Sequence, residues 1–218
     1  MSLTQPEQIF ESFRTELAPR EDQNALVPLL VSGDASLASI GALAAEQHRI
    51  IPSDRRSFLT LAVRSEAHSP AGEFFAGLAA GEYAALAKLP ALAAAAGMDA
   101  EDVRAYRPMP ECQAYPSYLA WLALNAEPAD AAMALLANFD AWGSYCGTVA
   151  QALRENYGFD DTACAFDLFA APVPGAREQA LAVAQEMLDL GDFETALSYG
   201  HLVQSYELMF WNGLLRLA

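Results

Sequence analysis

Apolar residues in this chain recur at intervals of three and four positions, and no segment alternates apolar and polar residues over the length of a strand. This spacing places the apolar side chains on one face of a helix, so the pattern predicts helices joined by short breaks. The 45 alanines favour the same structure, because alanine has the highest helix propensity. The expected helices are Pro6–Leu17, Asp22–Val31, Ser36–Ile51, a helix capped by Ser53, Pro70–Met98 with a break at Pro90, Asp99–Tyr106, Glu111–Asn125, Pro128–Tyr157, one from Asp160 or Asp161 to Pro172 and Pro174, Gly175–Leu190 and Asp192–Leu217.

Two features set the boundaries of the third expected helix. Ser36 is an expected N-cap, and Pro52 is expected to end the helix because proline disfavours helical geometry at the residue before it. No fixed-period repeat, low-complexity linker or change in composition divides the chain. We therefore expect one all-α domain that spans residues 1–218 and contains about ten helices.

Charge and composition exclude several classes of protein. The chain carries 28 acidic and 12 basic residues, a net charge of −16, and its single lysine is Lys88. Nucleic acids and anionic membranes bind clustered Lys and Arg, so neither is an expected partner. Gly81, Glu82, Lys88 and Pro90 interrupt the longest alanine-rich tract, so no membrane span is expected. The cysteines are odd in number and lack metal-site spacing, and no apolar leader is seen. We therefore expect the protein to be located in a reducing cytoplasm.

Glu207 is the most informative single residue, because it lies in a run of large apolar and aromatic side chains, Ser205–Asn212. Helical spacing places it on one stripe with Gln204, Trp211 and Leu214. If that stripe lines a cavity, we expect a desolvated carboxyl group with a raised pKa. If the stripe is plain core, we expect an arginine or a tyrosine as its structural partner.

The helix Pro128–Tyr157 has a second mixed face. Asn138, Trp142 and Tyr145 share it with leucine and valine at spacings of three and four, which suits a cavity that holds an aromatic ring. A core helix with two satisfied polar groups fits the pattern equally well. Gly143 and Gly147, one turn apart, are expected to admit a neighbouring backbone.

The three histidines and the carboxylates lack ligand spacing, so neither a metal nor a cofactor is expected.

Three segments together resemble the TenA family. Met109–Leu119, with Tyr115 and Tyr118, is similar to the family's tyrosine-rich segment. Ala134–Trp142 is similar to its Leu-Leu-Pro-Cys segment, and Tyr206–Asn212 to its Tyr-Glu-x-x-Phe-Trp ending. Glu46–Pro52 looks more like the related PqqC proteins. The resemblance implies a haem-oxygenase-like helical bundle, usually a tetramer. It also implies thiaminase-II-type hydrolysis of aminopyrimidines or, as in PqqC, cofactor-independent oxidation.

The resemblance carries over to this sequence one residue at a time. Tyr115 and Glu207 match family site residues, but the nucleophilic cysteine falls on Asn138, which cannot form the covalent intermediate. Cys146 lies about 12 Å further along the helix and is too far away to replace it. In the remaining matches, Trp142 and Phe166 stand at two positions where the family has tyrosine. Glu46 or Gln47 stands at the position of the family's substrate-orienting aspartate.

Two functions remain open. In the first, the chain is an enzyme acting on a small planar heterocycle, a hydrolase or a cofactor-independent oxidase. Glu207 would then be the acid or base and Tyr115 its hydrogen-bonding partner, while Asn138, Trp142, Phe166, Tyr145, Gln47 and Glu46 would bind the ligand. In the second, it is a catalytically silent binding protein. The net charge disfavours a third role, direct DNA binding. The large apolar content and the resemblance together suggest a homo-oligomer, a dimer or a tetramer.

Overall fold

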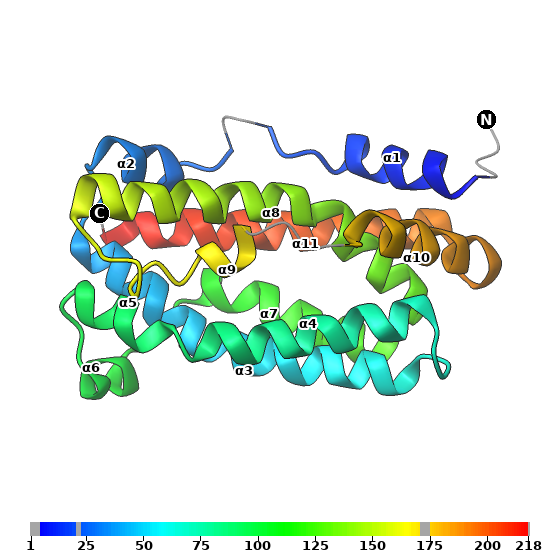
Figure 1. The fold of residues 1–218 in the computed structure, drawn as a ribbon, viewed down its shortest axis with the longest axis horizontal. Helices are drawn as coiled ribbons and strands as arrows, with labels where there is room; N and C mark the ends of the chain where they lie inside the picture. The colour runs from blue at the N-terminus through cyan, green and yellow to red at the C-terminus, as the bar shows by residue number, and fades with distance from the viewer. Residues whose placement is uncertain (1–4, 21–22, 171–174, 218) are drawn as a thin grey trace.

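The chain folds into helices joined by short connections (Figure 1). The computed structural model describes residues 5–20, 23–170 and 175–217, and none of these lies in a strand. The α-helices are α1 (Pro6–Glu16), α2 (Leu26–Ser32), α3 (Leu37–Arg64), α4 (Pro70–Leu86), α5 (Leu89–Ala95), α6 (Ala100–Ala105), α7 (Pro110–Asn125), α8 (Pro128–Tyr157), α9 (Asp167–Ala170), α10 (Ala176–Leu190) and α11 (Phe193–Gly213), and the 3₁₀ helix η1 (Leu214–Leu217) follows α11. The all-α prediction is therefore confirmed, and α8 has the expected bounds.

Polar side chains start several helices where the sequence predicts them. Ser36 accepts a hydrogen bond from the Ser39 amide at 3.0 Å and begins α3. Asp99 forms a capping box with Asp102 at the start of α6. These bonds satisfy amide groups that have no partner within the helix. The starts of these helices are thus encoded locally.

The expected end of a helix at Ile51–Pro52 is wrong. α3 continues through Pro52 to Arg64, and Ser53 lies inside it rather than capping a new helix. Proline removes one backbone hydrogen bond, and packing of α3 along α4 and α7 compensates for that loss. The consequence is that residues two turns apart on either side of Pro52, such as Gln47 and Asp54, share one face of a single helix.

The expected helix from Asp160 or Asp161 is also wrong. The Asp160 carboxylate accepts hydrogen bonds from the amides of Thr162 and Ala163, which form a turn instead. Between Asp160 and residue 170, where this described range ends, only the four residues of α9 are helical. Pro172 and Pro174, the expected terminators, lie outside the described residues.

Long helices run side by side along the molecule (Figure 1). α3 packs along α4, while α11 packs against both α7 and α8. Buried apolar side chains form two clusters, one around Trp211 and Leu153 and the other around Phe13 and Phe75. Tyr115 packs against both clusters, so it marks the region where the core is divided.

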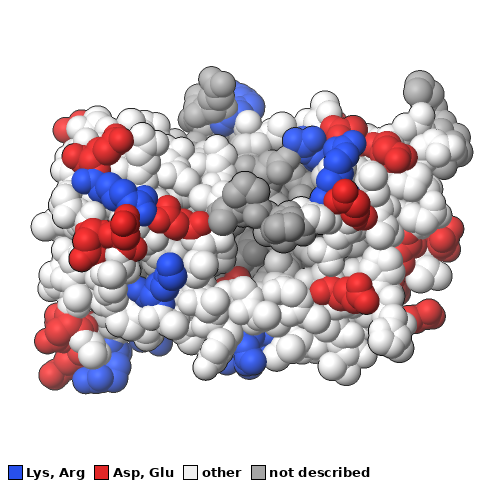
Figure 2. All heavy atoms as spheres, viewed as in Figure 1, with Lys and Arg blue, Asp and Glu red and all other residues white. Residues whose placement is uncertain are grey.

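The surface carries no basic patch on the face in Figure 2, where the blue side chains are scattered and several lie beside red ones. Several arginines in the described part of the chain pair with acids, as in Arg154–Asp161 at 2.8 Å and Arg177–Glu11 at 3.4 Å. Over the same residues, no helix has the length and apolarity needed to cross a membrane.

Candidate functional site

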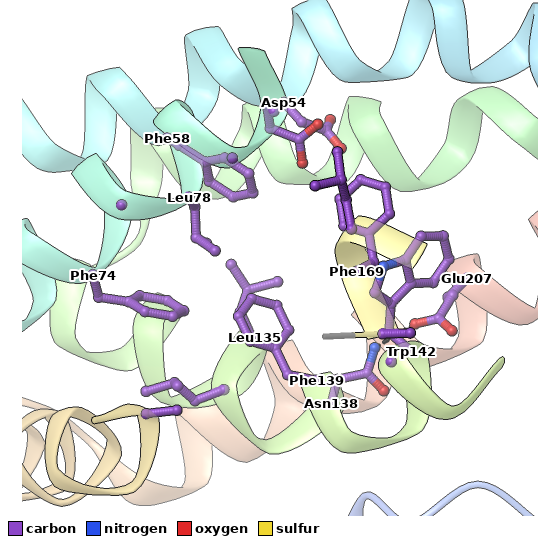
Figure 3. A pocket seen from close by; sticks show the side chains of 18 of the residues that line it. Asp54, Phe58, Phe74, Leu78, Leu135, Asn138, Phe139, Trp142, Phe169 and Glu207 are labelled. Atoms are coloured by element: carbon purple, nitrogen blue, oxygen red, sulfur yellow. Dashed lines mark hydrogen bonds between the residues drawn. The ribbon is translucent and has the colours of Figure 1, made fainter. Parts of the chain in front are cut away.

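A cavity of about 800 Å³ lies among the long helices. α3, α4, α7, α8, α9, α10 and α11 all contribute to its wall. Phenylalanine and leucine side chains form most of the surface in Figure 3, and the polar groups stand at separate places around it. The polar residues of the wall are Gln47, Asp54, Glu82, Tyr115, Asn138, Ser144, Gln179 and Glu207. A mostly apolar wall with a few polar groups is typical of a small-molecule site.

Asn138 and Glu207 form the central contact of this site. The Asn138 Nδ2 amide donates a hydrogen bond to Glu207 Oε2, and Trp211 Nε1 donates one to Glu207 Oε1 at 3.4 Å. Glu207 is 6% exposed and Asn138 is 5% exposed. The carboxyl group therefore has neither of the expected partners, an arginine or a tyrosine, among the described residues.

Burial controls the ionisation of Glu207. It raises the pKa of Glu207 to about 7, and the hydrogen bonds from Asn138 and Trp211 limit the rise. Of the two alternatives for this stripe, the structure has the one in which Glu207 lines a cavity. A group with this pKa is present in both protonation states near neutral pH, as general acid–base chemistry requires.

Aromatic side chains form the cavity wall near Glu207. Trp142 lies 5.4 Å from Trp211 and 5.9 Å from Phe169, measured between ring centroids. A Cβ atom on Gly143 would lie 3.2 Å from the Phe169 carbonyl oxygen, so the glycine admits α9 against α8. The expected close approach of a backbone at this glycine is confirmed, and it brings Phe169 to the cavity wall (Figure 3).

Five of the expected site residues line the cavity, namely Gln47, Tyr115, Asn138, Trp142 and Glu207. Phe166 does not: it is 1% exposed and packs behind Phe169 and Trp211. Tyr145 contacts the ring of Trp211 and is also absent from the cavity wall. The ring beside Trp142 on the wall is thus Phe169, where the sequence predicted Phe166.

Glu46 has a structural position instead of the expected ligand-binding one. Its carboxylate accepts hydrogen bonds from the Tyr106 hydroxyl at 3.0 Å, the Met109 amide at 2.6 Å and the Gln113 side chain at 2.7 Å. These bonds tie α3 to the start of α7. Of the two candidates for the orienting position, only Gln47 faces the cavity.

Cys146 is fully buried and lies outside the cavity wall. Burial and the nearby Glu207 charge raise the pKa of its thiol well above the usual value. A protonated, enclosed thiol is a poor nucleophile. The structure therefore agrees with the expectation that Cys146 does not replace the missing cysteine.

Asp54 and Glu82 are cavity residues that the sequence analysis missed. Burial, with a contribution from Glu82, raises the pKa of Asp54 well above its usual value, and burial raises the pKa of Glu82 to about 8. The charges of both, with that of Glu207, add to the effect of burial on Tyr115 and raise the pKa of its hydroxyl. The sequence signal that could have identified this pair is Glu82 itself, because it is an acidic residue in an alanine-rich helix.

A model of the TENA/THI-4/PQQC family matches residues 29–217, nearly the whole chain. The chain belongs to this family. No curated protein matches the chain.

The part of the chain that the structure describes contains no group of three or more His, Cys, Asp or Glu side chains arranged to hold a metal ion.

Several solved structures share the fold of this chain. A TenA family transcription regulator from Silicibacter sp. TM1040 superimposes with a TM-score of 0.72 at 18% identity, over 95% of this chain and 96% of that one. A domain of unknown function with a heme oxygenase-like fold from Shewanella denitrificans OS217 gives 0.70 at 12%, over 96% and 90%. A TenA homologue from P. horikoshii OT3 gives 0.65 at 16%, over 98% and 95%. The haem-oxygenase-like fold predicted from the sequence is therefore confirmed.

The raised pKa values predict how stability varies with pH. Glu207, Glu82 and Asp54 keep their protons to a higher pH in the folded chain than in the unfolded chain. Unfolding then releases protons between about pH 5 and pH 8, so the free energy of unfolding falls as pH rises through this range. We expect the melting temperature of the protein without ligand to fall by roughly 5–10 °C from about pH 5 to about pH 8.

The double variant Asp54→Asn/Glu82→Gln should lose a large part of this slope, because it removes two of the groups that cause it. Glu73→Gln, an exposed position on α4, should keep the wild-type slope. A wild-type melting temperature that is constant or rises between these pH values would contradict the assignment of buried, proton-holding carboxyl groups.

Proposed function

We propose that the cavity binds a small planar heterocycle and that Glu207 exchanges a proton with it. The observation that supports this most directly is the buried contact between Asn138 and Glu207 beside the rings of Trp142 and Phe169. A carboxyl group and an amide can recognise the edge of a ring, while aromatic side chains pack on its face. Membership of the family supports the same ligand class.

Each polar group in the proposal has a defined role. Asn138 Oδ1 is buried without a hydrogen-bond partner among the described residues, so it is available to accept one from a ring amino group. Glu207, with a pKa of about 7, can give a proton to a ring nitrogen or take one from it. Tyr115 stays neutral and can donate its hydroxyl proton in a hydrogen bond. Gln47 adds an amide from α3.

A second candidate is a protein that binds the same ligand without transforming it. Asn138 favours this alternative, because an asparagine at the position of the family's cysteine removes the covalent step. In the first candidate, any turnover is acid–base chemistry on the heterocycle by a hydrolase or a cofactor-independent oxidase. The two share a binding site and differ only in turnover.

The binding proposal predicts a specific effect of Glu207→Gln. A thermal-shift screen of aminopyrimidines, thiamin and other planar heterocycles should find ligands for the wild type. Glu207→Gln keeps the size of the side chain and loses its proton exchange, so it should bind them about tenfold or more weakly, while the protein alone melts within a few degrees of the wild type. Glu155→Gln, an exposed position at the far end of α8, is the matched control and should bind normally. Equal affinity in the wild type and Glu207→Gln would contradict the role of Glu207.

Thiaminase-type hydrolysis should be absent or very slow. Loss of a covalent nucleophile lowers rates by orders of magnitude, and Cys146 lies outside the cavity wall. The measurement is mass spectrometry of thiamin and an aminopyrimidine after incubation with the wild type. Robust product formation would overturn the role given to Asn138. Asn138→Cys is the informative variant, although Trp142 at a family tyrosine position limits the recovery expected from it.

We also propose that the chain forms a homo-oligomer through neighbouring faces of α7 and α11. Trp121 is 46% exposed, although it stacks on Tyr118 at 5.7 Å and meets Tyr199 edge-on at 6.0 Å. Leu124 is 72% exposed on the same helix. Exposed aromatic and aliphatic groups that lie close together are typical of protein interfaces.

This arrangement predicts a dimer or a tetramer in solution. Light scattering at micromolar concentration should give a mass two or four times that of the chain, and Trp121→Glu with Leu124→Glu should shift it to the monomer. Val63→Glu, an exposed apolar position on α3, is the control and should leave the mass unchanged. A monomeric wild type would contradict the proposal.

A further inference from the structure

Two carboxyl groups face the cavity away from the Asn138–Glu207 contact. Asp54 comes from α3 and Glu82 from α4, two helices that pack along each other. Asp54 is 4% exposed, and its carboxyl group points into the cavity in Figure 3, on the side opposite Asn138. The side chains of Phe58, Leu78 and Leu135 lie on the wall between them (Figure 3).

Among the described residues, no hydrogen bond uses the capacity of this pair. Asp54 Oδ1 and Glu82 Oε2 are both buried, and neither has a hydrogen-bond partner among the described residues. In the same part of the chain, neither carboxyl group forms an ion pair with a lysine or an arginine. Buried carboxyl groups normally have partners, because an unpaired charge or polar atom out of water is costly. An arrangement that keeps two of them unpaired at a cavity wall indicates a partner supplied by the ligand.

We propose that Asp54 and Glu82 form a subsite for a positively charged amine or amidinium group of the ligand. This inference rests on the proposed function, since it adds a second recognition point to the same cavity. The ligand class becomes a planar ring that carries an ammonium or amidinium group on the side away from Glu207. The apolar wall between the two polar regions fits an uncharged ring or short chain that joins them.

The charges around the subsite favour a cation over an anion or a neutral group. Among the described residues, the titratable groups that face it are Asp54 on α3, Glu82 on α4, Tyr115 on α7 and Glu207 on α11, and none of them is basic. Carboxylates only accept hydrogen bonds, whereas ammonium and amidinium groups only donate them. The net charge of −16 also attracts cations toward the molecule.

Binding of a cation changes the proton content of the pair. Near neutral pH Glu82, with a pKa of about 8, holds a proton. A cation beside the pair stabilises the doubly ionised form, so protons held by the pair pass to the buffer as the ligand binds. The cation and the carboxyl pair form no covalent bond, and the complex holds fewer protons than its separate components.

Matched probes test this subsite apart from the rest of the site. Calorimetry would compare 2-phenylethylamine with 2-phenylethanol, and benzamidine with benzamide, at neutral pH. The wild type should bind each cation roughly tenfold or more tightly than its neutral partner. Asp54→Asn and Glu82→Gln should each reduce this preference to less than about threefold, while Glu73→Gln should keep it. In wild-type protein, titration in buffers with different enthalpies of ionisation should show proton release with the amine and none with the alcohol.

The outcomes separate this inference from the proposed function. If cations and neutral probes bind the wild type equally well, or if neither carboxamide variant changes the preference, the subsite is overturned, whatever the heterocycles do. If the preference follows Asp54 and Glu82 but heterocycle binding does not depend on Glu207, the subsite stands and the proposed function fails. The proton release needs no variant, so it still decides the question if Asp54→Asn or Glu82→Gln folds poorly.

Discussion

The hydrogen bond from the Asn138 amide to the Glu207 carboxyl group joins α8 to α11 in the interior of the molecule. It gives a buried acid a neutral partner, and so it permits the carboxyl group to remain there without an arginine. Trp211 supplies the second hydrogen bond and also touches Trp142, Tyr145, Phe166 and Phe210 through its ring. The aromatic end of the cavity is therefore organised around Trp211, one of the two side chains that donate hydrogen bonds to Glu207.

Polar groups at the cavity wall account for the division of the core. The two apolar clusters meet near Tyr115, and the three carboxyl groups that influence this tyrosine come from α3, α4 and α11. Apolar side chains alone would have closed this space, since interiors pack densely. Stability and binding consequently act against each other here: the protons held by Asp54 and Glu82 stabilise the empty protein, and a cationic ligand in the proposed subsite would displace them.

Much of the fold could be predicted from the sequence, because its signals are local. The spacing of apolar residues gives the helices, Ser36 and Asp99 give their starts, and Gly143 gives a close helix contact. The position of Asn138 in a family segment, and of Glu207 among aromatic residues, also identified the central pair of the site. The local turn at Asp160 and the short α9 were missed, because side-chain hydrogen bonds to the backbone competed with helix formation there.

What the sequence by itself determined is the all-α class, most of the helices and the residues at the centre of the cavity. Only the tertiary structure decided which side of each helix the cavity occupies. Packing against α4 and α7 carries α3 through Pro52, which brings Asp54 onto the face of Gln47 and opposite Glu82. The same packing turns Glu46 toward Tyr106 and Gln113, one residue away from a place on the wall. A helix has neighbours on several sides, and spacing along the chain does not say which neighbour leaves a space.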